Sequence, residues 1–148
     1  SVTVVGSVSV TASATSYNTS SDYRLKENVV PMTGSIDRLK ALKPSKFNFI
    51  KNPDTTVDGF LAHEAQTVVP EAVTGTKDAM NDIGTTTDAE GVTITENRVE
   101  PAELEEGQTW TKTGEEADYQ GIDQAKLVPL LVSALQEAIA RIETLENA

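Results

Sequence analysis

The chain has 148 residues, with 12 basic and 23 acidic side chains, a formal net charge of −11 and a single histidine. It contains no cysteine, which excludes a disulfide framework, a thiolate nucleophile and a cysteine-ligated zinc site. No apolar run reaches the roughly 20 residues that a bilayer span needs, and the N-terminus lacks the pattern of a signal peptide. We therefore expect no metal or cofactor, no nucleic acid and no membrane among its ligands and partners.

Residues 1–20 carry no charged side chain and are rich in serine, threonine and valine. Val2 and Val4 alternate with hydroxyl residues, as do Val8 and Val10, which is the period of a β-strand. Such an uncharged strand would aggregate through its edges unless neighbouring chains satisfied them. The segment therefore reads as the C-terminal end of a larger β-rich protein.

The next 50 residues mix charges almost evenly and predict short helices and strands. Apolar residues at three-residue steps predict a helix over residues 35–42, with Ser35 as its N-cap. Residues 46–50 alternate as a strand, residues 52–54 and 58–59 are typical of turns, and residues 59–69 change from strand to helix.

Most of the acidity lies in residues 71–118, which contain three basic and thirteen acidic side chains. Hydrophobic residues are sparse there, and only Val92 and Ile94 indicate a hairpin strand. The stretch is therefore expected to lack a core of its own and to be an extended excursion or partly disordered. Its charge fits either a solvated, repulsive surface or an arm that touches a partner.

The C-terminal segment predicts a helix over residues 123–147, with Asp123 as its N-cap. Its apolar residues are spaced as the a and d positions of a heptad repeat, and we call this set the heptad seam: Val128, Leu131, Leu135, Ala138, Ile142 and Leu145. Further apolar residues widen this face. The helix can therefore self-associate through the seam or dock on its own domain.

Chemistry is suggested by Ser21-Asp22-Tyr23-Arg24-Leu25-Lys26, although a charged surface loop has the same composition. A serine hydroxyl needs a base to act as a nucleophile, and a lysine is that base only in its neutral form. Positions five residues apart diverge on a helix and lie on opposite faces of a strand. Ser21 and Lys26 can therefore meet only if the segment bends, or if Lys26 reaches Ser21 of another chain.

The same segment carries a resemblance. Ser-Asp-x-Arg-x-Lys, followed by LKALKPSKFNF, GFLAHEAQTVVPEAV and IDQAKLVPLLVSALQEAIARIETLE, resembles the intramolecular chaperone domain of phage tailspikes and tail fibres, the endosialidase-type C-terminal domain. The resemblance covers residues 21–75 and 119–148. It implies an α+β fold in an elongated, intertwined homotrimer of short strands and helices, with a C-terminal helical bundle or coiled coil.

The resemblance also implies a domain plan. Residues 1–20 end the fibre or spike, and residues 21–148 form the chaperone domain. Within that domain, residues 74–118 are a tentacle-like acidic insertion and residues 123–147 are the trimerising helix. The chaperone domain would be made with the fibre in the host bacterial cytoplasm and be released after cleavage, while the fibre enters the virion tail.

Carried over residue by residue, the family's chemistry makes Ser21 the nucleophile and Lys26 its general base. Asp22 and Arg24 occupy supporting positions, and Ser20–Ser21 is the bond that is cut. The expected activity is that of a self-cleaving serine endopeptidase with a Ser-Lys dyad, acting once. The preceding fibre or spike is its folding client. The alternative is a non-cleaving trimeric tip that binds a host receptor.

Overall fold

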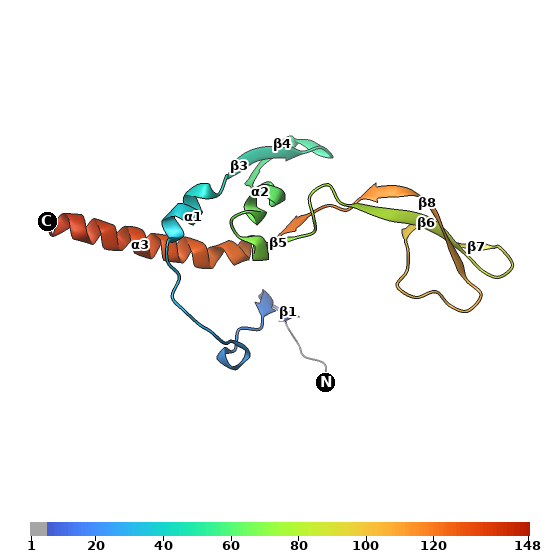
Figure 1. Ribbon diagram of the computed structural model, residues 1–148, viewed down its shortest axis with the longest axis horizontal. Coiled ribbons are helices and arrows are strands. Elements are labelled where there is room, and N and C mark those ends of the chain that lie inside the picture. The colour runs from blue at the N-terminus through green and yellow to red at the C-terminus, as the bar shows by residue number, and fades with distance from the viewer. Residues whose placement is uncertain (1–5) are drawn as a thin grey trace. The chain divides into compact units, whose positions relative to one another are not determined.

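The computed structural model describes residues 6–148, and the chain divides into two compact units with the boundary between Thr33 and Gly34. Both helices and antiparallel strands are present, which confirms the α+β class. Among the described residues, no helix combines the length and apolar character that crossing a bilayer requires. Figure 1 shows the elements in chain order.

The first unit contains a β-hairpin and one short helix. Strand β1 (Gly6–Val10) pairs antiparallel with β2 (Thr15–Thr19), and the 3-10 helix η1 (Tyr23–Leu25) follows. Val8 and Val10 lie on β1 as the alternation predicted, whereas Val2 and Val4 lie outside the described residues. Every described residue of this unit is exposed, so the hairpin has no core of its own.

The second unit packs short helices against one long helix and carries four strand pairings. Its elements are α1 (Ser35–Ala41), β3 (Ser45–Phe49), β4 (Asn52–Gly59), α2 (Ala62–Gln66), η2 (Pro70–Ala72), β5 (Val73–Thr74), β6 (Met80–Thr87), β7 (Thr93–Val99), β8 (Thr109–Ala117), β9 (Gly121–Ile122), η3 (Gln124–Leu127) and α3 (Val128–Glu146). Strands β3 and β4 form one hairpin, and β5 pairs antiparallel with β9.

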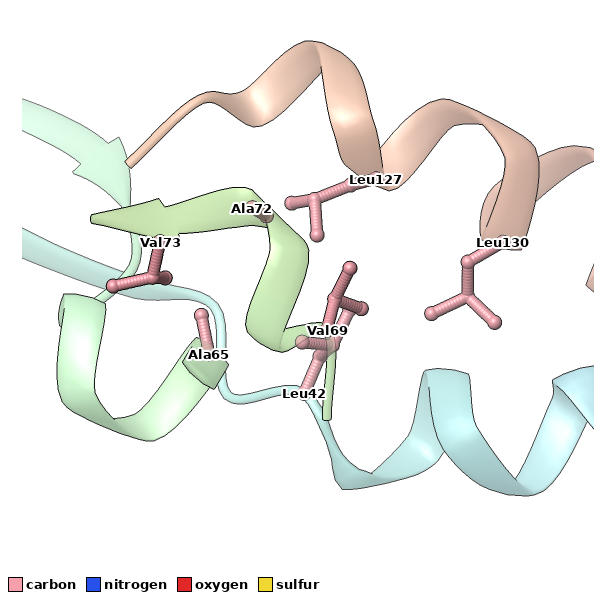
Figure 2. Close-up of a cluster of buried hydrophobic side chains, with 7 residues drawn as sticks. All are labelled: Leu42, Ala65, Val69, Ala72, Val73, Leu127 and Leu130. Atoms are coloured by element: carbon pink, nitrogen blue, oxygen red, sulfur yellow. The ribbon is translucent and has the colours of Figure 1, made fainter. Parts of the chain in front are cut away.

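A small apolar core joins these helices. Figure 2 shows the side chains of Leu127 from η3 and Leu130 from α3 on one side of the cluster, and those from the C-terminal end of α1 and from the stretch α2 to β5 on the other. The buried members are Leu42, Ala65, Val69, Ala72, Val73, Leu127 and Leu130. None of them is aromatic, as expected for a chain with one Trp, three Tyr and three Phe.

Helix α1 begins one residue earlier than the predicted capping pattern, and its cap is different. The N-cap is Gly34, whose φ of 67° places it in the left-handed region, and Ser35 is the first helical residue. A carboxylate from α3 takes over the capping role: Ser35 N donates to Glu137 Oε1 at 2.8 Å, and Ile36 N donates to Oε2 at 3.3 Å. The prediction of Ser35 as N-cap was therefore wrong, because a tertiary contact satisfies the helix end.

The two turns predicted near residues 52–54 and 58–59 were also wrong. The β3–β4 hairpin turns at Ile50 and Lys51, while Asn52 and Pro53 already belong to β4. The register shifts beside Asn48, whose side-chain amide donates to the Pro53 carbonyl at 2.7 Å. A proline fits there because an irregularity in the ladder needs no N–H from it.

Where the sequence predicted an extended excursion or partial disorder, strands β6, β7 and β8 of the acidic stretch form an antiparallel sheet in the order β7-β6-β8. Ile94 lies on β7 as predicted, whereas Val92 precedes it. The indole of Trp110 lies over Gly84, where an added Cβ would come within 2.5 Å of Cε2. The indole therefore covers a position on β6 that only a glycine fits.

Helix α3 presents two different apolar faces. Leu130 and Ala134, each 2% exposed, face the domain's own core, and η3, capped by Asp123 as predicted, adds Leu127. Five of the six heptad-seam residues are exposed, Leu135 by 61%. The helix therefore docks on its own domain mainly through residues outside its seam.

Candidate functional site

The hydroxyl and the amine singled out in the sequence lie together in one chain. Lys26 Nζ donates to Ser21 Oγ at 2.7 Å, a short hydrogen bond. The segment between them bends through η1, and Lys26 N donates to the Tyr23 carbonyl at 3.1 Å. The bend that the five-residue spacing required is therefore present, and no second chain is needed to bring these two atoms into contact.

Asp22 builds the bend. It is the N-cap of η1, with extended backbone angles (φ −63°, ψ 135°), and its Oδ1 accepts from Arg24 N at 2.9 Å. An aspartate carboxylate at this position satisfies a backbone N–H that would otherwise lack a helical partner. The cap bends the chain between Ser21 and Lys26, so that the two side chains come within hydrogen-bond distance of each other.

The same carboxylate pairs with the side chain of Arg24. Arg24 Nε donates to Asp22 Oδ1 at 2.9 Å and Nη2 donates to Oδ2 at 2.8 Å, which is a bidentate ion pair. The Arg24 guanidinium and then its backbone N–H hold the pKa of Asp22 below its ordinary value, and the charge of Lys26 acts in the same direction. The pair also raises the pKa of Arg24.

The site is open to solvent in the single chain. Residues 20–26 are all exposed, and Tyr23 and Leu25 expose 81% and 65% of their surfaces. Water can therefore reach the segment that holds Ser20, Ser21 and Lys26. Within residues 6–148, no three His, Asp or Glu side chains are grouped so as to hold a metal ion.

The arrangement can perform one kind of chemistry. A hydroxyl and a nitrogen base at hydrogen-bond distance form a nucleophile-base pair. Attack of Ser21 Oγ on the carbonyl carbon of Ser20 closes a five-membered ring, whereas attack on the carbonyl carbon of Ser21 itself would need a strained four-membered ring. The pair is therefore placed to act on its own backbone.

Residues 21–74 match the family model of peptidase S74, described as the chaperone of endosialidase. Over this segment the chain is similar to that family. The match begins at Ser21 and includes the Ser-Asp-x-Arg-x-Lys motif, the core helices α1 and α2, and the β3–β4 hairpin. A search of curated proteins found no match.

The family match confirms the resemblance and supports a chaperone role for the domain. It also begins at the serine of the predicted cleavage site, and the family's name places its members among peptidases. The resemblance of residues 119–148 lies outside the matched segment and stays a prediction.

The sequence alone does not define the geometry around Asp22 and Arg24. It places both residues in supporting positions, although an aspartate directly before a short turn is an N-cap signal. The role of Glu137 has no local signal, because this residue lies about 100 residues from α1, the helix that it caps. A contact over that separation leaves no local pattern.

Proposed function

We propose that this chain is a C-terminal intramolecular chaperone that trimerises, guides the folding of a preceding phage fibre or spike, and then releases itself by cutting the Ser20–Ser21 bond. The observation that carries the proposal is the 2.7 Å hydrogen bond between Lys26 Nζ and Ser21 Oγ, directly beside the expected scissile bond. The family match at Ser21 supports it.

The proposed cleavage uses the groups of one turn. Neutral Lys26 takes the hydroxyl proton while Ser21 Oγ attacks the carbonyl carbon of Ser20. The C–N bond then breaks, and the Ser21 amine leaves with the proton that Lys26 returns. The resulting ester between Ser20 and Ser21 Oγ is hydrolysed by water, which yields the Ser20 carboxylate and restores the hydroxyl. Direct attack by a water that Ser21 assists gives the same products.

Positioning supplies much of the rate in this scheme. Well-oriented intramolecular reactions reach effective molarities of about 10⁵–10⁸ M. Each molecule cuts its own bond once, so the enzyme is a single-turnover serine endopeptidase with a Ser-Lys dyad. A donor is still needed for the developing oxyanion. Because Arg24 is engaged by Asp22, a backbone N–H is the better candidate.

Self-association is supported by what the single chain leaves exposed. The heptad seam on α3 faces away from the domain's own core, and Val8, Tyr17 and Tyr23 of the first unit are exposed by 63–81%. An apolar groove of about 440 Å³ adjoins the seam at Leu131. Burying such surfaces against further copies is favourable, and the family resemblance makes three the expected number.

The proposed client is the β-rich segment that precedes Ser21. Strands of a trimeric fibre pair between chains, so their nucleation is slow and exposes edges to aggregation. A trimerising domain at the C-terminus raises the local concentration of the three chain ends and aligns them. Cleavage then removes the domain in the host cytoplasm, and the fibre that enters the virion persists for kinetic reasons.

The cleavage is tested with two substitutions in the 148-residue chain. Ser21→Ala removes the nucleophile and Lys26→Ala removes the base, so we expect both variants to trimerise and to stay at full length at neutral pH. Intact mass and light scattering measure both properties. A fragment starting at residue 21 in Ser21→Ala rules out Ser21 as the nucleophile, and normal cleavage of Lys26→Ala rules out Lys26 as the base.

The same measurement separates the alternative function. A non-cleaving trimeric tip would stay at full length as the unsubstituted chain and would bind a cell-surface glycan. The proposed chaperone instead yields a product of 128 residues that begins at Ser21.

A further inference from the structure

A carboxylate beside a lysine that must lose its proton presents an electrostatic problem. A negative charge near an amine favours the ammonium form, which cannot act as a base. Asp22 nevertheless lies four residues before Lys26, in the middle of the candidate site, and the two charges act on each other. Its presence there needs a reason that outweighs this cost.

The contacts of Asp22 supply that reason. Oδ1 accepts the Arg24 backbone N–H at 2.9 Å and so forms the cap of η1, which bends the chain between Ser21 and Lys26. The two side-chain contacts with Arg24, at 2.9 and 2.8 Å, engage both oxygens of the carboxylate and balance its charge.

Resting on the proposed function, we infer that Asp22 and Arg24 are two positioning residues with separate tasks. Asp22 makes the turn that brings Ser21 Oγ to Lys26 Nζ. Arg24 neutralises the carboxylate that makes this turn, so that Lys26 is free to lose its proton. Neither residue touches the reacting atoms, and both act through the dyad.

The other charged groups of the segment do not share these tasks. Its titratable side chains are Asp22, Tyr23, Arg24, Lys26 and Glu27. Among them, Asp22 is the group that contacts Arg24 through both carboxylate oxygens and whose charge interacts with Lys26. The pairing also keeps the pKa of Asp22 low, so the ion pair is intact across the neutral range.

The turn is tested by comparing alanine and asparagine at position 22. Asp22→Ala removes the cap, and we expect the cleavage rate to fall about 10²-fold, the effect of a misplacement of roughly 1 Å. Asp22→Asn keeps an oxygen that can accept the Arg24 N–H, and we expect cleavage within about threefold of the unsubstituted chain. Rates come from intact mass against time after refolding, and circular dichroism checks that both variants fold.

The charge role is tested by the pH profile of cleavage. Arg24→Ala keeps the cap but leaves the Asp22 carboxylate without its ion-pair partner, so we expect the midpoint of the cleavage profile to move to higher pH by a few tenths of a unit, as for an exposed charge pair. Adding Asp22→Asn to this variant removes the bare charge, and the midpoint should return to that of the unsubstituted chain.

Two cleavage results overturn the inference. Cleavage of Asp22→Ala at the unsubstituted rate removes the turn role from Asp22. A double variant that keeps the shift of Arg24→Ala shows that the arginine acts by its own charge and not by neutralising Asp22.

A readout that needs no cleavage separates this inference from the proposed function. In Ser21→Ala, the Arg24 amide resonance in NMR should titrate with Asp22, with a midpoint below the ordinary aspartate value of about 3.9. A midpoint at that ordinary value contradicts the pairing of Asp22 with Arg24, even if the chain cleaves. A low midpoint in a chain that never cleaves supports this pairing and rejects the proteolytic function.

Discussion

Truncating two leucines on opposite faces of α3 separates the stability of the domain from its assembly. Leu130 is 2% exposed and packs in the core, whereas Leu135 lies in the heptad seam and is 61% exposed. Leu130→Ala should lower the free energy of unfolding by about 2–5 kcal/mol, the usual cost of this change in a core. Leu135→Ala should cost a monomer no more than about 0.5 kcal/mol.

The cost of Leu135→Ala is larger if three copies meet at the seam. Burying a leucine side chain completely contributes about 1.5–3 kcal/mol, so covering the exposed 61% contributes about 1–2 kcal/mol in each copy. Three copies lose about 3–5 kcal/mol together. At 1.4 kcal/mol for each factor of ten, the association constant of the trimer falls about 10²–10⁴-fold.

The assay is molar mass by light scattering over a dilution series, combined with thermal unfolding followed by circular dichroism. We expect Leu135→Ala to dissociate at concentrations at which the unsubstituted chain stays trimeric, with its helix content retained. Leu130→Ala should unfold at a lower temperature. If the Leu135 variant keeps the molar mass of the unsubstituted chain at every dilution, the assignment of the seam to the trimer interface is refuted.

Two further predictions concern the second unit. Gly84→Ala should lower its stability by about 1–3 kcal/mol, because the new methyl group would collide with the Thr111 carbonyl and with Trp110. Gly114→Ala, whose Cβ would meet Ile83 at an ordinary 3.7 Å, is the control, and equal melting temperatures of the two variants would contradict the reasoning. Glu137 should make the stability of the second unit depend on pH, because the backbone N–H of Ser35 lowers the pKa of this carboxyl. The free energy that Glu137 contributes to folding is present above the unfolded pKa near 4.5, and it is lost as the pH falls through the lower folded pKa. Glu137→Gln keeps an acceptor for α1 but cannot titrate, so its melting temperature should fall less between pH 7 and pH 3, and an identical fall in both proteins would remove this role.

Local patterns predicted most helices and some strands. The three-residue spacing located α1, the strand alternation located β3, and the heptad spacing located α3, while the predicted cap Asp123 begins the preceding η3. These predictions succeeded because amphipathic periodicity and caps are properties of neighbouring residues.

Predictions that depended on distant contacts failed. The carboxylate of Glu137 replaced the cap expected from Ser35, and the acidic segment forms a sheet in which Trp110 lies over Gly84. Residues 52–54 were predicted as a turn but lie in β4, because the shift in strand register beside Asn48 accommodates Pro53 within the strand. None of these contacts leaves a periodic signal in the sequence.

The candidate site was predictable in its members but not in its geometry. Residue types suggested Ser21 and Lys26 as a nucleophile and a base, and their spacing required a bend that the sequence alone did not place. The cap that Asp22 gives to η1 supplies the bend within one chain. The pairing of this carboxylate with Arg24 was beyond reach, because either side chain could have faced solvent.

The most direct test of the account is the intact mass of the 148-residue chain, measured over time after folding under conditions in which it is trimeric. The account predicts that the full-length mass converts to two products, one of 20 residues and one of 128 residues beginning at Ser21. A trimer that keeps its full-length mass at neutral and mildly alkaline pH would contradict it.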